Sequence, residues 1–347
     1  LSATRVDASQ LIEKGRENLF IYSNDFNSGW SPKAGTFTQG VTDPNGGSTA
    51  WSWTATNTDP YLYQYWGFSG VHCISVWAKG VGSTIGDDIE LRIGGSINYF
   101  TLTSEWKRFE AFAVLNGATN IGFEYGNPAT SGDVIHIYGA QLELGLVATP
   151  YIETGASTAQ AGILENTPRF DYSGGATCPS LLLEPSRTNL VPQSEYLASF
   201  SGFGITITTN YGISPEGVKN ATRFQTNAGV RGVIYDGVPV VNGSTYILSM
   251  YVKSLSGNQK VRIGADLGCT NPQGAETFDV GTEWIRVETT ITSSQSSWNV
   301  FIDNVESGIN CTGTYLAADL LIYGFQCEQG SYATSYIPTY GVSQTRA

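Results

Sequence analysis

Hydrophobic and polar residues alternate in short runs along the whole chain. Residues 74–78 (Ile-Ser-Val-Trp-Ala) and 135–138 (Ile-His-Ile-Tyr) follow a period of two, which is typical of β-strands with one buried face. No stretch of about a dozen residues shows the 3.6-residue period of an amphipathic helix. The pattern predicts an all-β protein with no helix longer than about three turns.

One pattern of strands and turns occurs twice. Residues 139–154 (GAQLELGLVATPYIET) match residues 324–339 (GFQCEQGSYATSYIPT), and ENLFIYSNDF and SEWKRFEAFAVL match TNLVPQSEYL and TEWIRVETTITS. The offset between the copies grows steadily, as expected if the second copy has longer loops around similar strands. We predict a linker at 1–16, domain 1 at 17–154, a linker at 155–187, domain 2 at 188–339, and the start of a further linker at 340–347.

Composition narrows the fold class and the kinds of partner. The 347 residues include 41 glycines and 19 tyrosines but only 14% charged residues, as in β-proteins rich in turns. Two-sheet sandwiches are the simplest fold for domains of this size with many such strands and glycine-rich turns. The net charge of −12 disfavours nucleic acid as a partner, and the strand-sized apolar runs predict no membrane insertion.

The cysteines show neither a CxxC motif nor the spacing of a zinc site. We expect reduced, partly buried thiols. A single Cys269–Cys311 disulfide is the alternative that the spacing leaves open. The five cysteines are Cys73, Cys178, Cys269, Cys311 and Cys327.

The order of motifs in each copy resembles a known family. N-L-x-x-x-S is followed by S-x-W/Y-x-K, by E-W-x-R, and by the closing Y-G-x-Q-x-E-x-G…T-x-Y-I-x-T. This order resembles the carbohydrate-binding-module-like jelly rolls of bacteriophage virion proteins, in tail fibres and head fibres, and residues 166–195 are similar to a linker in such proteins. The resemblance implies two tandem jelly rolls at the virion surface, with surface polysaccharides or other glycans and other virion proteins as partners.

Aromatic residues concentrate in WSWTATNTDPYLYQYWGF, residues 51–68 of the first copy. Aromatic rings stack on the apolar faces of sugars, while amides and carboxylates bind the hydroxyls. This stretch is our candidate glycan site, and the alternative is that one of its faces is core. The matching region of the second copy has Tyr235 as its main aromatic residue, which favours a spacer or docking role there. The candidate ligand-binding residues are Trp51, Trp53, Asn57, Asp59, Tyr61, Tyr63, Gln64, Tyr65 and Trp66.

The resemblance also implies a structural calcium, held by carboxylate and backbone oxygens. Calcium takes six to eight such ligands. The nearest candidates are Asp133 and Glu143 in the first copy and Asp319 and Glu328 in the second. No contiguous D-x-D-x-D loop is present, and the alternative is that these are solvated carboxylates at strand ends.

Catalysis is not predicted. His72 and His136 are the only histidines, and there is no G-x-S-x-G nucleophile motif. Glu143 and Glu328 recur in both copies, which favours a structural hydrogen bond or a bound cation over glycosidase chemistry. We predict a non-catalytic glycan-binding virion protein; the alternative is a purely structural fibre or capsid-decoration module without its own ligand.

Period-two alternation also predicts how the closing strand faces. Leu142 and Cys327 point into the core, and the flanking Gln and Glu point to solvent or ligand. Tyr138 and Tyr323 then share the face of Leu142 and Cys327. In each linker, a glutamate and the arginine three residues later are expected to form an exposed ion pair contributing about 0–1 kcal/mol. The two pairs are Glu13–Arg16 and Glu184–Arg187.

Overall fold

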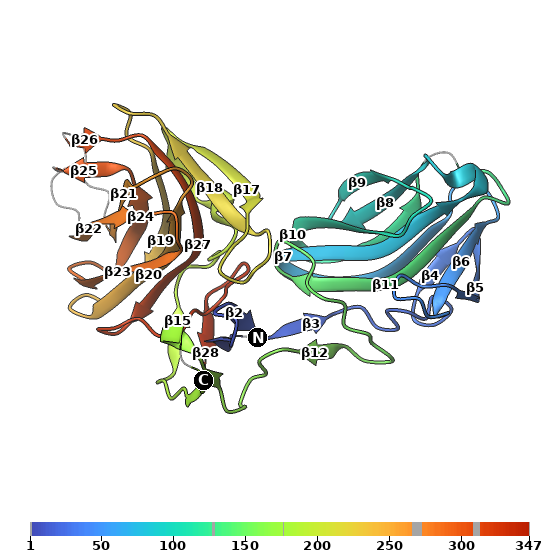
Figure 1. Ribbon diagram of the computed structural model, residues 1–347, viewed down its shortest axis with the longest axis horizontal. Coiled ribbons are helices and arrows are strands. Elements are labelled where there is room, and N and C mark those ends of the chain that lie inside the picture. The colour runs from blue at the N-terminus through green and yellow to red at the C-terminus, as the bar shows by residue number, and fades with distance from the viewer. Residues whose placement is uncertain (1, 127–128, 176, 266–272, 308–312, 347) are drawn as a thin grey trace. The chain divides into compact units, whose positions relative to one another are not determined.

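The computed structural model describes residues 2–126, 129–175, 177–265, 273–307 and 313–346. Helical structure in these ranges is limited to three short 3-10 helices, η1 (Gly82–Thr84), η2 (Ser173–Gly175) and η3 (Leu197–Ser199), and none could cross a membrane. Contacts divide the chain into two compact units, Arg16–Ala161 and Leu1–Gly15 with Gly162–Ala347. We call these the first and second units. The predicted all-β fold of two jelly-roll sandwiches is confirmed (Figure 1).

The first unit is one sandwich built from a continuous bent sheet. Its strand order is β5-β6-β11-β7-β10-β8-β9, with β4 beside β7 and with β12 paired to β3. The strands are β3 (Arg16–Asn18), β4 (Ser31–Lys33), β5 (Gly35–Val41), β6 (Ala50–Ala55), β7 (Tyr61–Val81), β8 (Asp88–Ile93), β9 (Ser96–Thr101), β10 (Lys107–Tyr125), β11 (Val134–Leu144) and β12 (Ala159–Ala161).

Two long strands, β7 and β10, pass from one layer of this sandwich into the other. β11 pairs with the second half of β7, whereas β4 pairs with the first three residues of β7. Gly70 (φ 99°) and Gly117 (φ 111°) lie where the strands change layer, in a backbone conformation that favours glycine. Leu62 and Ile74, from the two halves of β7, therefore belong to one core.

The second unit contains a sandwich of two separate five-stranded sheets. Their strand orders are β16-β19-β24-β21-β22 and β17-β18-β27-β20-β23. Here β19 and β20 take the place of β7, and β23 and β24 take the place of β10. The strands are β15 (Arg187–Asn189), β16 (Ser201–Phe203), β17 (Thr206–Gly212), β18 (Ala221–Thr226), β19 (Val233–Pro239), β20 (Thr245–Ser254), β21 (Gln259–Ala265), β22 (Gln273–Val280), β23 (Ile285–Thr292), β24 (Ser297–Asp303), β25 (Val305–Ser307), β26 (Thr314–Tyr315) and β27 (Ala318–Gln329).

The chain's first residues pack on the second sandwich. β1 (Thr4–Val6) and β2 (Ile12–Lys14) form a hairpin within residues 2–15, which we call the strap. The Ile12 side chain packs against Tyr323 and Tyr336. β13 (Phe170–Asp171) pairs with β14 (Ser180–Leu181), and β28 (Gln344–Arg346) pairs with β15. Residues 1–15 and 162–187, assigned to linkers in the sequence analysis, thus belong to the compact second unit.

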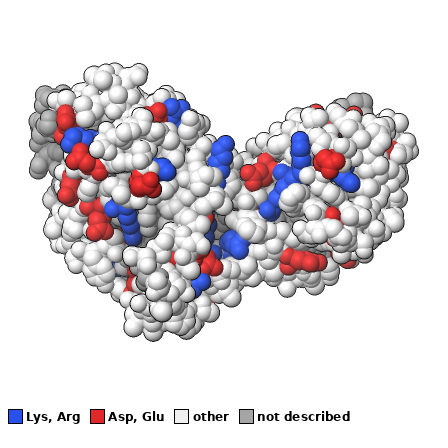
Figure 2. All heavy atoms as spheres, viewed as in Figure 1, with Lys and Arg blue, Asp and Glu red and all other residues white. Residues whose placement is uncertain are grey.

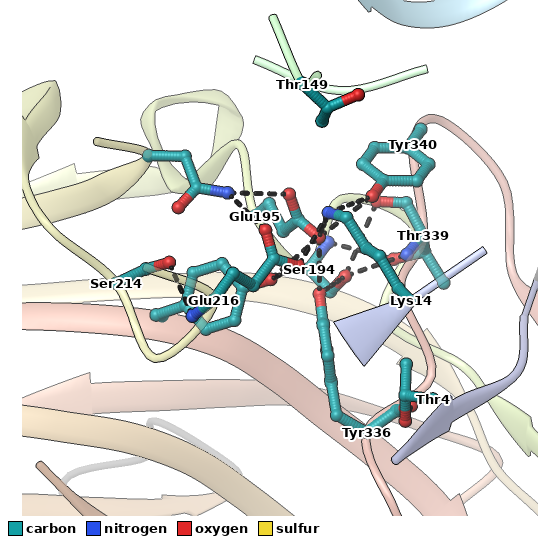
Figure 3. A network of polar contacts seen from close by, with 12 residues as sticks. Thr4, Lys14, Thr149, Ser194, Glu195, Ser214, Glu216, Tyr336, Thr339 and Tyr340 are labelled. Carbon is teal, nitrogen blue, oxygen red and sulfur yellow. Dashed lines mark hydrogen bonds and ion pairs between the residues drawn. The ribbon is translucent and has the colours of Figure 1, made fainter. Parts of the chain in front are cut away.

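The strap inserts Lys14 into a buried acidic socket of the second sandwich (Figure 3). The ammonium lies 2.9 Å from Glu195 and 2.7 Å from Glu216, and it donates to the Tyr340 hydroxyl at 2.7 Å. The Tyr323 hydroxyl donates to both carboxylates. Burial alone would lower the pKa of Lys14, but the charges of Glu195 and Glu216 outweigh it and raise that pKa. We call these residues the lysine socket.

The ion pairs predicted within the two linkers do not form, because their glutamates have other partners. Glu13 pairs with Arg5 across the strap hairpin at 2.7 Å. Glu184 lies 3.0 Å from Arg169 and 3.4 Å from Arg346, and the Arg346 side chain is almost fully buried. These pairs join segments far apart in sequence, which the local spacing of Glu and Arg does not reveal.

The tail that occurs twice is a hydrogen-bond network that closes each sandwich. In the first unit, Gln141 accepts from the Ile152 amide at 2.8 Å and donates to Glu143 at 2.6 Å. Glu143 also accepts from the Thr149 amide and hydroxyl. Each sandwich therefore ties its exit segment back to its own last long strand. The second unit repeats these bonds with Gln326, Ile337, Glu328 and Thr334.

For the closing strands β11 and β27, the prediction of which side chains face the core is correct at Leu142 and Cys327. It is wrong for the glutamine and glutamate beside them. Leu142 and Cys327 are fully buried in the two cores. Gln141 is also fully buried, since the exit segment covers it. Tyr138 leaves the core face because the strand bulges after it, at Gly139 (φ 62°), which shifts the alternation.

Three cysteines lie among the described residues and have free thiols. Cys73 and Cys327 are buried, and Cys178 is exposed. Burial raises the pKa of the Cys327 thiol. Cys269 and Cys311, the pair considered for a disulfide, lie outside the described residues.

Candidate ligand-binding face

Strand β7 carries three of the predicted tyrosines on its outer side. Tyr61, Tyr63 and Tyr65 alternate with Leu62 and Gln64, which are buried. The rings of Tyr61 and Tyr63 are stacked, with centroids 4.7 Å apart and planes 12° apart. The Tyr65 side chain is 71% exposed. We call this side of β7, with the positions beside it on β10, β8 and β9, the tyrosine face.

A charged cluster of two buried glutamates and a partly exposed arginine lies beside these rings. In the sheet register, Glu124 of β10 is opposite Tyr61 and next to Glu90 of β8. Arg92 donates to Glu90 at 2.8 Å and pairs with Glu124, while the Tyr63 hydroxyl donates to Glu124 at 2.7 Å. Burial raises the pKa of Glu124, although the hydrogen bond from Tyr63 and the charge of Arg92 act against it. The cluster fixes the ring of Tyr63.

A glycine lets the Tyr63 ring reach across β10. A Cβ on Gly122 would lie 2.1 Å from the Leu62 carbonyl oxygen and 2.8 Å from the Cδ1 atom of Tyr63, so a larger residue would displace both the β7 backbone and the ring. The face continues onto β9, where Tyr99 is 58% exposed and Ile97 is 42% exposed. Aromatic and aliphatic surface thus surrounds a small polar centre, an arrangement suited to a ligand with both apolar and hydroxyl surfaces.

The loop before β7 adds polar groups at one end of the face. Lys33 forms an exposed ion pair with Asp59 at 2.6 Å, and its ammonium lies 5.1 Å from the centre of the Tyr61 ring. The hydrogen bond from Lys33 lowers the pKa of Asp59. Asn57 accepts a hydrogen bond from the Asp59 amide at 2.9 Å, which shapes the turn. Asn57 and Asp59 are both exposed.

Three other predicted ligand residues are structural, so placing them in the site was wrong. Trp51 (5% exposed) and Trp53 (fully buried) belong to the core. The core has room for the Trp53 ring because Gly35 faces it; a Cβ there would lie 2.2 Å from the indole nitrogen. Gln64 is buried and makes two hydrogen bonds with the backbone of Ile21, at 2.6 and 3.3 Å.

Trp66 belongs to the opposite side of β7 from the tyrosines. Its ring is half-buried against the edge of the core and stacks on Phe68, with centroids 5.5 Å apart. Its indole donates to Gln64 at 3.1 Å. Trp66 is therefore not part of the tyrosine face.

The carboxylates predicted to bind calcium cannot share an ion within each copy. Asp133 precedes β11 and Glu143 lies near its end, which separates them by about 30 Å along the strand. Asp319 and Glu328 occupy the two ends of β27 in the same way. Asp319 is instead paired with Arg223 at 2.7 Å. The described part of the chain holds no group of three or more His, Cys, Asp or Glu placed to bind a metal.

The two histidines make packing contacts. His72 is buried and stacks on Phe68, with ring centroids 5.1 Å apart. His136 lies beside Trp106, at 6.4 Å between centroids. Burial lowers the pKa of both imidazoles, so both are neutral near pH 7.

Sequence reasoning missed the polar centre of the face. Residues 89–93 read Ile-Glu-Leu-Arg-Ile, a strict alternation that predicts a strand with Glu90 and Arg92 on one side. That signal was available. The neighbouring Glu124 was not recognisable, because only the sheet register brings it between Tyr61 and Glu90.

The equivalent surface of the second sandwich is constructed differently. Register places Phe301 opposite Tyr235, where the first sandwich has Gly122 opposite Tyr63. Phe301 is fully buried, and the Arg262 guanidinium lies 5.5 Å from its ring centre. The position opposite the tyrosine is thus a glycine in the first sandwich and a buried phenylalanine in the second.

Charged groups on the visible surface form small islands of both signs (Figure 2). Basic and acidic side chains alternate over each unit, and most of the surface shown is uncharged. No continuous basic patch crosses this side of the described surface. A nucleic-acid backbone would need such a patch.

Comparisons with known proteins found structural similarity only. No family model and no curated protein matches the sequence. Among solved structures, the CBM22-1–CBM22-2 tandem of Paenibacillus barcinonensis Xyn10C is 12% identical, covers 90% of this chain and 97% of its own, and has a TM-score of 0.29. The active domain of tailspike protein 4 of bacteriophage CBA120 is 11% identical over 40% of this chain and 21% of its own, with a TM-score of 0.28. The ANX2 ectodomain of Arabidopsis thaliana is 10% identical over 92% and 97%, with a TM-score of 0.28.

Proposed function

We propose that the protein is a non-catalytic glycan-binding component of a bacteriophage virion appendage. In this proposal, the first sandwich binds saccharides of a bacterial or environmental surface through its tyrosine face. The observation that carries the proposal is the row Tyr61, Tyr63 and Tyr65 on one side of β7, beside the cluster of buried Glu90 and Glu124 with the partly exposed Arg92.

The geometry suits a sugar because two kinds of contact are side by side. The exposed Tyr65 ring offers apolar area to the C–H face of a pyranose, and the stacked Tyr61 and Tyr63 continue that area. Oxygens of Glu90 and Glu124 and the remaining N–H groups of Arg92 provide acceptors and donors for hydroxyls. Their mutual bonds hold them in place before a ligand arrives, which lowers the cost of ordering.

Affinity of a single face is expected to be weak. A few stacked rings remove little apolar area from water, and sugar hydroxyls give up their hydration on binding. Display of many copies on one particle converts weak sites into firm attachment. The virion location, the other virion proteins as partners, and the absence of nucleic-acid and membrane partners rest on the motif order and the net charge of −12.

The test is a glycan array probed with the protein displayed multivalently on beads. Binding to at least one glycan class is expected, with loss in Tyr65→Ala. Tyr211→Ala is the matched control, because Tyr211 is an exposed tyrosine (41%) on a sheet of the second sandwich. Binding that survives Tyr65→Ala unchanged would contradict the assignment of the face. Absence of binding to every glycan would favour the alternative, a structural fibre or decoration module without its own ligand.

A further inference from the structure

The second unit contains a pocket of about 760 Å³, a size within the range of small-ligand sites. It lies where β15, the connection between β19 and β20, and the end of β27 meet. The tyrosine face belongs to the other unit, so the two sites are distinct. Polar lining residues include Arg187, Thr188, Thr245, Gln329 and Ser331.

Arg187 is the charged residue that lines this pocket. Its side chain is 23% exposed, and its Nε is buried without a hydrogen-bond partner among the described residues. The guanidinium lies across the backbone of Gly330, where a Cβ would approach the nearest guanidinium nitrogen to 2.9 Å. A planar group with five N–H donors is thus held at the pocket wall.

The nearest carboxylate does not take up these donors. Glu328 lies 4.0 Å from the Nε of Arg187, which is beyond hydrogen-bond distance. Its oxygens already accept from Gln326 at 2.9 Å and from the amide and hydroxyl of Thr334, both at 2.7 Å. Glu328 therefore orients the guanidinium electrostatically while leaving its N–H groups for another acceptor.

The surroundings of Arg187 suit a hydroxylated ligand. The Tyr332 ring, 52% exposed, lies 5.8 Å from the guanidinium carbon and offers a stacking surface. Thr188, Thr245 and Ser331 bring hydroxyls to the pocket. The lining contains one cation and no acid, although the protein carries a net charge of −12. The buried Glu328 offsets part of the Arg187 charge, so an anionic acceptor is favoured by the hydrogen-bond donors of the guanidinium and not by a net positive field.

We propose that this pocket binds a carboxylate-bearing saccharide, with the carboxylate on the Arg187 guanidinium. A planar carboxylate can accept two parallel N–H bonds from the arginine fork. The sugar ring then lies toward Tyr332, and its hydroxyls meet Thr188, Thr245 and Ser331. The second sandwich is thus a binding module in its own right, specific for an acidic sugar.

The first unit has an arginine at the equivalent place without this environment. Arg16 of β3 pairs with β12 as Arg187 of β15 pairs with β28. Arg16 donates to the Pro150 carbonyl at 3.4 Å. Leu144 and Leu146 stand where the second unit has Gln329 and Ser331. Arg16 therefore provides a matched control for loss of a β-strand arginine.

The test is NMR titration of the full chain with methyl β-D-glucuronide, methyl β-D-glucoside and glucose 6-sulfate. We expect the glucuronide to bind with a millimolar Kd. Each charge-assisted hydrogen bond to Arg187 should lower that Kd by a factor of roughly ten or more. Arg187→Gln should lose that factor, and Arg16→Gln should keep wild-type binding. Equal binding of the glucoside, or tighter binding of the sulfate, would overturn the carboxylate assignment.

A second variant keeps the test decisive if Arg187→Gln does not fold. Val241 at the pocket wall is 62% exposed, so Val241→Glu adds a repelling charge without changing the core. Glucuronide binding should weaken in this variant, and the weakening should shrink at high salt. Unchanged binding would overturn the proposal. Tyr65→Ala should weaken binding to the tyrosine face, whereas Arg187→Gln and Val241→Glu should not. The two proposals can therefore be contradicted independently.

Discussion

The two sandwiches make the same hydrogen bonds at their closing strands and differ in what they present elsewhere. Where the first has Gly122 beneath a tyrosine ring, the second has the buried Phe301. Where the second receives Lys14 between Glu195 and Glu216, the first has asparagines. The repeated residues close the fold, and the residues that differ give each sandwich its own packing and its own partners.

The turn that contributes to the lysine socket shows how small such a difference is. Residues 43–46 and 214–217 form the same turn, with the Gly46 and Gly217 amides donating back three residues. The third residue of that turn is Asn45 in the first sandwich and Glu216 in the second. A glutamate in place of an asparagine at each of two positions provides the two carboxylates that hold Lys14.

Replacing Lys14 should cause the largest loss of stability, and the loss should be confined to the second unit. Lys14→Met leaves Glu195 and Glu216 buried without their cation, and breaking a buried pair in this way costs about 3–5 kcal/mol. We expect the second unit to unfold at lower urea concentration, measured by circular dichroism.

The matched control for this variant is Lys33→Met in the first unit. Lys33 and Asp59 form an exposed pair, with side chains 47% and 52% exposed, so no measurable change is expected. Trp fluorescence follows the first unit, which holds six of the eight tryptophans. Equal losses of stability in Lys14→Met and Lys33→Met would contradict a stabilising role specific to the lysine socket.

The closing network should respond equally in both units. Asn18 donates to the carbonyls of Ala140 and Ile152 and accepts from the Leu142 amide, and Asn189 makes the equivalent bonds. Asn18→Ala and Asn189→Ala each orphan buried backbone groups, at about 1–3 kcal/mol per group. Thermal scans should show similar losses in the two variants. A loss confined to one variant would show that the repeated bonds are not equivalent in energy.

Glu184 in the second unit and Glu143 in the first should make the stability of the two units depend on pH in opposite directions. Burial acts to raise the pKa of Glu184, but hydrogen bonds from Ser335 and nearby arginines lower it below 4.5, so its stabilisation is present above that pH and is lost in acid. Burial raises the pKa of Glu143 above 4.5, so its contribution is present in acid and is lost as pH rises through the folded value.

The measurement for this prediction is urea unfolding at pH 7, 5 and 3.5. Glu184→Gln should cost about 1.5–3 kcal/mol at pH 7, and that cost should shrink in acid. As the pH falls, the free energy of unfolding of the wild type should rise relative to that of Glu143→Gln. Parallel pH trends in the two variants would contradict these assignments.

The sequence predicted the features that local patterns encode. Alternation and the drifting repeat predicted strands and two sandwiches, and the tyrosine series on β7 was placed on one side of a strand. Trp51 and Trp53 were misplaced because period two says which residues share a face and not which face is core. The lysine socket could not be predicted, since Lys14 lies about 180 residues or more along the chain from the other members and meets them only in the fold.

The smallest expected effect tests the tyrosine face itself. Tyr63→Phe removes the hydrogen bond to Glu124, whose oxygen then loses one donor in a buried site, at about 1 kcal/mol. Tyr235→Phe is the matched control, because no hydrogen bond of the Tyr235 hydroxyl is found within the described residues. If the second sandwich has lost the polar centre of the first, only Tyr63→Phe should lower the urea midpoint. Equal shifts would mean that the Tyr63–Glu124 bond contributes nothing specific to the first sandwich. A selective loss, together with weaker glycan binding on the array, would show that this hydroxyl both fixes the ring and organises the face.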